Sequence, residues 1–236
     1  DNTVIKFCNH LGYEKFTEFK KEFTSYAHSE LLIYNKIGGE TAPVSEGDSV
    51  WSMIQNDAIA SLQETLSDPQ NHSSLTELLA RMEKAKHIYV TGGRLSGIAA
   101  AMLANKLRYL NLQVHDLSCG TVGDYIDQTA LVQPEDLVIA ISFPRYTKRV
   151  VTALEDMHRR GVPIALITDK GLSPVHPFAD IVFHCATDSS AFMPCYTGCL
   201  ALIDVICQAV CMEHRSEITE YVRDLEKRLL AQGVWM

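Results

Sequence analysis

Hydroxyl and guanidinium groups gather in one short stretch of this sequence, directly after an apolar run. The run 137–141 is short and rich in β-branched residues, which is typical of a strand buried on both faces, and 148–160 has apolar residues at helical spacing. The turn between them holds Ser142, Arg145, Tyr146 and Thr147. A turn from strand to helix exposes unpaired N–H groups at the positive end of a helix dipole, and these side chains would complete an anion site. We interpret the turn as half of a phosphate-binding site.

A second turn of the same kind lies earlier in the chain. Residues 87–91 are typical of a strand, and 98–109 of a helix rich in Ala and Leu. The loop between them holds Gly92, Gly93, Arg94 and Ser96. Glycine lets the backbone approach a ligand closely, Ser96 can cap the helix, and Arg94 offers a bidentate donor to phosphate or carboxylate. The alternative is an ordinary tight turn; a dinucleotide fingerprint is excluded, because the G-x-G-x-x-G spacing is missing.

Strand and helix patterns alternate from residue 87 onward. We expect strands at 87–91, 112–117, 137–142, 163–168 and 180–184, helices at 96–110, 147–160, 194–213 and 215–231, and a short helical or irregular stretch at 121–132. Such alternation indicates an α/β fold, with a parallel sheet between two layers of helices. Ligands of such sheets collect beyond the carboxyl ends of the strands, where both candidate loops lie. We therefore expect the two loops to converge.

The N-terminal part of the chain is predicted to be helical. Apolar residues at helical spacing favour a helix over 2–11, Gly12 ends it, and a second helix starts in 16–23. Residues 38–49 contain two consecutive glycines, a proline and several small polar residues, so we interpret them as an interdomain linker.

Two more helices are expected between this linker and the first strand. An amphipathic helix can be drawn over 50–66, and the polar stretch 67–73 breaks it. Ser74 and Glu77 have the spacing of a capping box, which predicts that the next helix begins there.

Composition limits the setting of the protein. The 236 residues are 47% hydrophobic, which is enough for one sizeable core and a small appended element. No apolar run has the length of a membrane span and no leader pattern opens the chain, so we expect a cytoplasmic protein without membrane contact. The formal charge of -8 argues against nonspecific coating of nucleic acid but allows a small DNA-binding module. Because the chain begins at Asp1, we expect further residues upstream.

Seven cysteines without a leader are expected to be reduced thiols. Cys195 with Cys199, and Cys207 with Cys211, are one helical turn apart, and His214 follows, so a metal site is one interpretation. Small apolar core residues are the preferred interpretation, because the cysteines stand among aliphatic residues and free cysteine is commonly buried. We predict no metal site and no cofactor.

Several motifs together resemble a known family. Residues 75–213 resemble a sugar isomerase (SIS) domain, and the chain as a whole is similar to the RpiR/MurR family of bacterial transcriptional regulators. The segment 141–147 resembles the phosphate-binding segment of that family in its S-F-P-R-Y-[ST] form, and 92–96 resembles its first glycine-rich loop. Upstream, 3–12 and 16–20 resemble the end of the family's helix-turn-helix domain.

This resemblance implies a division of the chain into three parts. Residues 1–37 would be the C-terminal part of a helix-turn-helix DNA-binding domain, 38–73 a linker and connecting helix, and 74–236 the SIS domain with its C-terminal helix. The helix at 2–11 would be the recognition helix. Its residues that could reach base edges or phosphates are Asn2, Thr3 and Lys6. Because the first helices of the DNA-binding domain are not in this sequence, we expect the chain alone to bind DNA poorly; the alternative is a plain helical bundle.

The resemblance also implies a phosphosugar effector that modulates binding to operator DNA. Two departures from the usual SIS pattern place Arg94 at the second glycine of the first loop and Arg145 in the usual S-x-S-G turn. Both add a guanidinium, which favours an effector with a second anionic group, such as a phosphorylated sugar acid. Arg94 could instead pair with Asp124. Ser189 and Ser190 are further candidate ligand contacts, from the same subunit or from its neighbour.

An enzyme is the alternative function, because SIS domains also serve as sugar-phosphate isomerases that need a positioned acid and base. The candidate bases His115, His158, His176 and His184 are scattered, and Lys148 and Arg149 stand where isomerase relatives tend to carry a glutamate. We therefore predict ligand binding without turnover. A third alternative is a SIS protein that binds a partner enzyme rather than DNA.

Apolar stripes on two helices predict self-association. The helices at 50–66 and 215–231 offer more apolar surface than one domain uses, so we expect a homodimer or homotetramer; the alternative is packing within one chain. A twofold dimer would also suit a palindromic operator.

Overall fold

The computed structural model describes residues 2–11, 13, 15–20, 49–118, 120–170 and 173–234. Two compact units are distinguished within the chain. The first comprises residues 1–55 and 189–194, and the second comprises 56–188 and 195–236. The predicted linker at 38–49 lies almost wholly outside the described residues, so the predicted division into three parts stays a prediction.

The second unit is built on a parallel sheet of five strands in the order β2-β1-β3-β4-β5. The strands are β1 (Ile88–Gly92), β2 (Val114–Asp116), β3 (Leu137–Ile141), β4 (Ile164–Thr168) and β5 (Ile181–His184). All neighbouring strands pair in parallel, and Gly92 at the end of β1 lies beside Ile141 at the end of β3. The five predicted strands and the α/β fold are confirmed.

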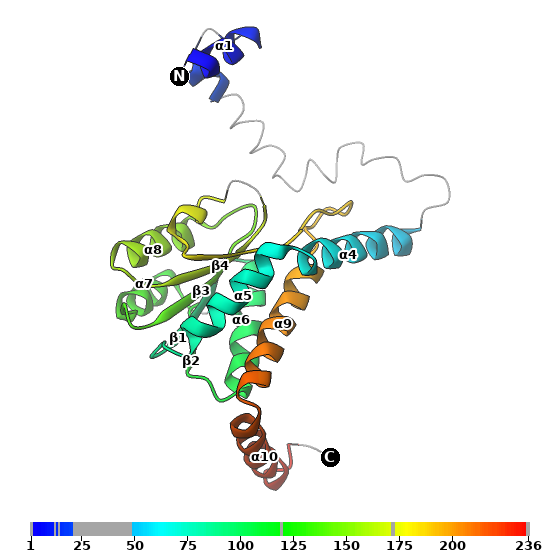
Figure 1. Ribbon diagram of the computed structural model, residues 1–236, viewed down its shortest axis with the longest axis vertical. Helices are drawn as coiled ribbons and strands as arrows, with labels where there is room; N and C mark the ends of the chain where they lie inside the picture. The colour runs from blue at the N-terminus through cyan, green and yellow to red at the C-terminus, as the bar shows by residue number, and fades with distance from the viewer. Residues whose placement is uncertain are drawn as a thin grey trace. The chain divides into compact units, whose positions relative to one another are not determined.

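Helices cover both faces of this sheet (Figure 1). The helices are α5 (Pro69–Met82), α6 (Leu95–Tyr109), α7 (Val122–Leu131), α8 (Lys148–Arg159), α9 (Thr197–Glu213) and α10 (Arg215–Ala231), with a 3-10 turn at His176–Phe178. One core joins α5, α6 and α9 to one face, and the other core joins α7 and α8 to the opposite face. Side chains alternate between the cores, as a pleated strand requires: Ile139 enters the first, and Val138 and Ala140 enter the second.

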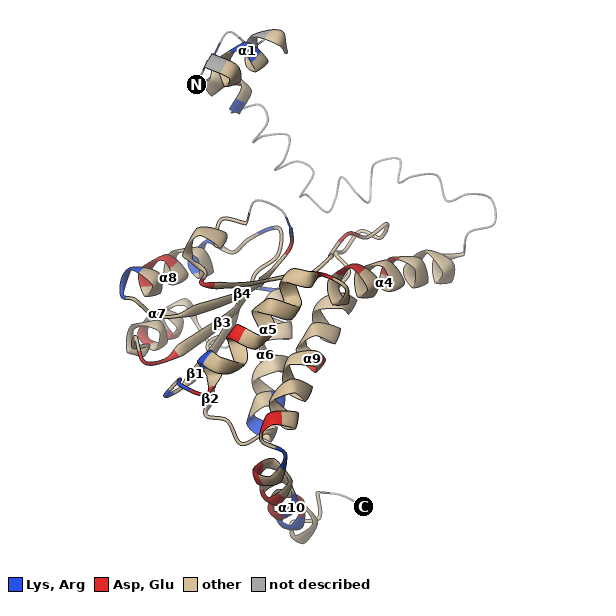
Figure 2. Ribbon diagram, viewed as in Figure 1, with Lys and Arg blue, Asp and Glu red and all other residues tan. Residues whose placement is uncertain are grey.

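The two C-terminal helices differ in charge because they differ in burial. Figure 2 shows few charged residues along α9, which packs in the core, and many of both signs along α10. On α10, Ile218 is buried and Val222 packs against the same core. Among the described residues, no single helix is long and apolar enough to cross a membrane; only α9 and α10 together, bent by 104° at their break, pass such a test, by length and composition alone.

In the first unit, α1 (Asn2–His10) and a further helical segment at 16–20 are described. Both helices were predicted, although the remainder of the predicted 16–23 helix lies outside the described residues. Helix α4 (Val50–Leu66) runs continuously from the first unit into the second, over the range that the sequence predicts.

The predicted start of α5 is wrong. The helix begins at Pro69, with Asp68 as its cap, and Ser74 lies inside it and donates a hydrogen bond to the carbonyl of Val182 at 2.6 Å. The side chain of Asp68 accepts from the N–H of Gln70 at 2.9 Å. A proline in the first turn favours a helix start, because its fixed φ suits the helix and its missing N–H would have no partner there. The proline therefore opens this helix and does not interrupt it.

Candidate functional site

The two predicted loops meet at the carboxyl edge of the sheet. Because Gly92 pairs with Ile141, the chain leaves β1 and β3 at the same level, on neighbouring strands about 4.8 Å apart. Gly93 lies directly against Thr147, so that a Cβ on Gly93 would overlap the Oγ1 and Cβ of that side chain. Only glycine fits here, and its role is to let the second loop approach the first.

The strand order places this contact at the point where the connections between strands begin to run in opposite directions across the sheet. From β1 the chain passes through α6 outward to β2, whereas from β3 it passes through α8 outward to β4 on the other side. Helices α6 and α8 cover opposite faces, so the loops that lead into them diverge at the point where sheets of this topology form a ligand crevice. Parallel sheets bind ligands at such a switch point, where two helix N-termini point toward one place.

Both arginines of the loops occupy a backbone conformation that favours glycine. Arg94 has φ 58° and precedes the first turn of α6, and Arg145 has φ 74° in the second loop. A positive φ costs a residue other than glycine about 1 kcal/mol or more, and such residues cluster at functional sites. Among the described residues, neither guanidinium forms an ion pair. The arginines are therefore available to an anion.

The alternative partner of Arg94 is occupied elsewhere. Asp124 closes a capping box at the start of α7, where its Oδ2 accepts from the N–H and the hydroxyl of Thr121, each at 2.7 Å. These hydrogen bonds lower the pKa of Asp124, so that carboxyl group stays ionised in its cap. The alternative in which Arg94 pairs with Asp124 is not found, because no ion pair joins these two described residues.

Tyr196, which the sequence analysis missed, contacts both loops. Its hydroxyl hydrogen-bonds with the hydroxyl of Ser96 at 3.1 Å. Its ring packs against the ring of Phe143 in an edge-to-face arrangement, with the ring centroids 5.2 Å apart. Burial raises the pKa of Tyr196, so the phenol stays protonated. Ser96 is therefore not the helix cap that the sequence predicts, because Arg94 holds the cap position and the Ser96 side chain points to Tyr196.

The second loop is also held by the strand next to it. Thr168 donates to the carbonyl of Ser142 at 2.7 Å, and Tyr146 donates to Asp169 at 2.9 Å. Burial and the nearby Asp169 carboxylate raise the pKa of Tyr146 far above its usual value, so its hydroxyl remains a donor. The side-chain hydroxyls of Ser142 and Thr147 make no hydrogen bond to another described residue, and Thr147 sits at the cap of α8. Both hydroxyls are therefore available beside the crevice.

A further serine lies beside the first loop. The hydroxyl of Ser118 is buried and has no hydrogen-bond partner among the described residues, and its Cβ lies 3.5 Å from where a Cβ on Gly97 would stand. A buried hydroxyl without a partner is costly. Ser118 is thus a candidate ligand contact, and no motif in the sequence marks it.

The remaining predicted contacts lie in the first unit. Ser189 and Ser190 belong to the segment 189–194, which groups with that unit, and their part in the ligand site stays a prediction. Asn2 and Thr3 open α1, and Lys6 is exposed on it, as a role in DNA contact requires.

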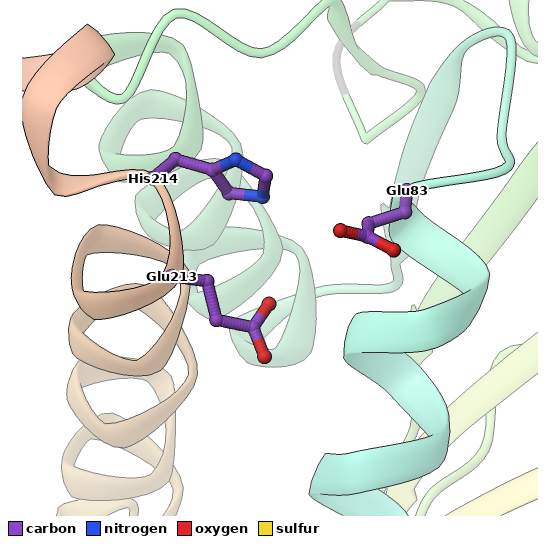
Figure 3. A group of neighbouring side chains, drawn as sticks. All are labelled: Glu83, Glu213 and His214. Atoms are coloured by element: carbon purple, nitrogen blue, oxygen red, sulfur yellow. The ribbon is translucent and has the colours of Figure 1, made fainter.

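The cysteines agree with the interpretation as core residues. Cys199 is fully buried, and Cys207 and Cys211 pack against the same core. A different group, Glu83, Glu213 and His214, has ligand-type atoms within 4.8 Å of one another, on two separate elements (Figure 3). It lies at the C-terminal end of α9, whereas Tyr196 precedes the first turn, and exposed carboxylates gather in this way without an ion. We assign no metal to it.

The SIS domain family model matches residues 81–209, which is more than half of the chain and includes both loops. The chain belongs to the SIS domain family. The region that the SIS family model matches thus contains the switch point, both loop arginines and Tyr196.

Relatives of this SIS protein are named as regulators. An uncharacterised HTH-type transcriptional regulator of Haemophilus influenzae is 26% identical over 181 residues, which is 76% of this chain. The match spans 62% of that protein's length, so the chain corresponds to less than two thirds of it.

Solved structures show the same fold. The sugar isomerase domain of an RpiR transcription factor from Sphaerobacter thermophilus has a TM-score of 0.69 at 23% identity, covering 76% of this chain and 99% of that one. The Vibrio vulnificus NanR protein, complexed with ManNAc-6P, has a TM-score of 0.67 at 20% identity, covering 98% of this chain and 81% of that one. Structures named as phosphosugar isomerases also share the fold.

Proposed function

We propose that this chain is the effector-binding part of a transcriptional regulator, whose SIS domain binds a phosphosugar between the loops 92–96 and 142–147. The observation that carries the proposal is the contact of Gly93 with Thr147 at the switch point, because it brings two helix N-termini and two sets of donors to one place. Relatives named as regulators and the NanR complex with ManNAc-6P support it.

Within this proposal, each loop has a role set by its chemistry. Ser142 and Thr147 supply hydroxyl donors, the N-terminal N–H groups of α8 face the same place, and Gly93 lets the first loop approach Thr147 closely. These groups bind a phosphate without a metal ion, since donors and helix dipoles supply the complementary charge.

The two loop arginines support an effector with more than one anionic group. Arg94 and Arg145 together carry two positive charges, and the N-termini of α6 and α8 add about half a charge each. This positive charge exceeds the two negative charges of one phosphate. We therefore favour a phosphorylated sugar acid, or a sugar with two phosphates, as the effector.

Binding without turnover is the favoured activity. None of the four candidate histidines lies in the two loops: His115 stacks on Tyr89 with ring centroids 4.9 Å apart, and His158 packs near Phe178. An aldose-ketose isomerase needs a base close to the sugar carbonyl. The proposed mechanism is instead a change of affinity between two states of a homo-oligomer, which would alter operator binding through α1 and residues Asn2, Thr3 and Lys6.

A thermal-shift titration tests the effector site. The panel contains hexose 6-phosphates, phosphorylated sugar acids, sugar bisphosphates, ManNAc-6P, the unphosphorylated sugars and inorganic phosphate. A specific effector at one hundred times its Kd stabilises the fold by about 2.7 kcal/mol and raises the midpoint by about 5 to 10 °C.

The matched variants are Ser142→Ala with Thr147→Ala, and Thr152→Ala on the exposed face of α8 as control. The double variant should lose the shift and keep its fold, whereas the control should keep both. Equal affinity in the double variant would show that the site is elsewhere, and conversion of an aldose phosphate to its ketose would show that the protein is an enzyme.

A further inference from the structure

The start of α9 touches three parts of the second unit that are far apart in the sequence. Tyr196 caps α9 and contacts Ser96 of the first loop and Phe143 of the second. Two residues later, Gly198 lies against α4, where a Cβ would stand 2.6 Å from the carbonyl oxygen of Ser61. One helical turn therefore contacts both ligand loops and α4.

The contact between α4 and the rest of the unit is made by buried hydrogen bonds. The N–H of Gly198 donates to the hydroxyl of Ser61 at 3.0 Å, and that hydroxyl donates to the carbonyl of Ala186 at 2.7 Å. The N–H of Ala186 donates to Thr65 at 3.1 Å. Ser61 and Thr65 are 2% and 1% exposed. Because these polar groups have no access to water, each must keep its partner, and the backbones on both sides move together.

Ser96 links this network to the ligand. Its hydroxyl is a proposed effector contact and also the partner of Tyr196. A hydroxyl has one donor, so an effector oxygen that receives it changes how Ser96 can bond to Tyr196. Helix α4 is continuous from Val50 to Leu66 and leads toward the N-terminal helices in the sequence.

We propose that the first turn of α9, through Tyr196 and Gly198, couples the two effector loops to α4 and so to the N-terminal module. Tyr196 is in this view a positioning residue. The coupling between loops and helix is a property of the unliganded protein, whereas its use by an effector rests on the proposed function.

Hydrogen–deuterium exchange of the whole chain without ligand tests the coupling. Ser61→Ala removes the two hydrogen bonds of the Ser61 hydroxyl, leaving that of Thr65, and should raise exchange about fivefold in the distant loops, at 92–97 and 142–147, because a buried hydrogen bond contributes about 1 kcal/mol. Tyr196→Phe should raise exchange about fivefold in residues 61–66. In each of these regions, the rise in exchange of the double variant should equal the larger of the two rises seen in the single variants, because the two residues act in one network.

The controls are Ser67→Ala, whose hydroxyl donates to the carbonyl of Gln63 in the adjacent last turn of α4, and Tyr109→Phe on the exposed face of α6. Neither should change exchange at a distance. If Ser61→Ala does not fold, Thr65→Val removes the acceptor of the Ala186 N–H with nearly the same shape. Faster exchange only beside each substituted residue, or additive effects in the double variant, would overturn the coupling.

A second arm separates the coupling from the effector site. Inorganic phosphate should slow exchange in both loops and in 61–66 of the unmodified protein, but only in the loops of Tyr196→Phe. Protection of the loops alone in the unmodified protein would overturn signal transfer through Tyr196. Absence of any protection by phosphate would instead contradict the proposed anion site, and the experiment without ligand would still decide the coupling.

Discussion

Two arginines in left-handed backbone are the residues that most clearly distinguish this site. Glycine would adopt the φ values of Arg94 and Arg145 without strain, yet both positions carry the side chain with the most hydrogen-bond donors. The strain costs stability and the guanidinium supplies charge beside the crevice. Such a combination is expected where ligand binding, rather than folding, determines the residue.

Replacing either arginine by glycine should separate these two effects. Arg94→Gly and Arg145→Gly should leave the free energy of unfolding unchanged or raise it by about 1 kcal/mol, because strain is relieved, while affinity for a phosphorylated sugar acid falls about tenfold or more. Chemical denaturation and calorimetric titration measure the two quantities. Arg94→Lys and Arg145→Lys, which keep a charge and the strain, are the controls. A glycine variant less stable than its lysine counterpart would contradict the argument.

At this scale the sequence predicts motif residues but misses their partners. Ser142 and Thr147 stand in a recognisable motif, so their place at a strand end follows from local pattern. Tyr196 contacts Ser96 from a position 100 residues away, and nothing in its surroundings in the sequence marks it as part of the site. The same holds for Ser118, whose buried hydroxyl is evident only once the sheet is formed.

Among the elements, the bounds of the strands and of the long helices were predicted to within a few residues. Each of these elements has a strong hydrophobic periodicity and lies in one kind of environment along its length. The start of α5 was wrong because a polar stretch containing proline resembles a loop until its cap is known. Asp68 supplies that cap and also an ion pair with Lys170 at 3.0 Å. Local composition shows the proline but not the lysine that comes from the loop after β4.

Asp68 should make the start of α5 sensitive to acid. Burial alone would raise the pKa of the Asp68 carboxyl. The hydrogen bonds from Lys170 and from the Gln70 N–H outweigh this effect of burial and lower the pKa below the usual value of 3.8. A lowered carboxyl pKa stabilises the fold above the unfolded value and loses that contribution as the pH falls below about 4. Asp68→Ala should cost about 1 kcal/mol at pH 7 and Asp68→Asn less, since asparagine still caps a helix.

Urea unfolding of the three proteins at pH 7 and pH 3 measures this contribution. The difference between the unmodified protein and Asp68→Asn should shrink at pH 3, because the unfolded chain, whose carboxyl keeps its usual pKa, then binds a proton more readily than the folded protein does. A difference that is equal at both pH values would mean that charge at Asp68 does not stabilise α5.

For the whole molecule, the sequence predicts the alternation of strands and helices but not the order of strands in the sheet. Order β2-β1-β3-β4-β5 creates the switch point beside β1 and β3, and no local pattern records it. The candidate site therefore results from the topology. Its motif residues come together because the strand order places the ends of β1 and β3 side by side.

Besides the helices at 50–66 and 215–231, which the sequence predicts to self-associate, an exposed apolar face of α6 and α9 is a further predicted contact. A groove of about 810 Å³ is lined there by Tyr109, Val205 and Met212, and Met212 is 70% exposed. Met212→Glu would place a charge in this face and should lower the sedimentation coefficient of the predicted homo-oligomer in sedimentation velocity. Ile126→Glu on α7 is the control, because that residue is equally apolar and exposed on the opposite face of the sheet. An unchanged sedimentation coefficient would show that this face is not the interface.

A small tilt of helix α9 at one end would displace its other end by a larger distance. Its 17 residues extend for about 25 Å, with Tyr196 at one end and Glu213 at the other. A tilt of about 5° at the end that touches the loops would displace the far end by about 2 Å. The groove beside Glu83, from which α10 departs, would change shape by that amount. Small movements around an anion at the proposed site would in this way be enlarged at the opposite end of the strands.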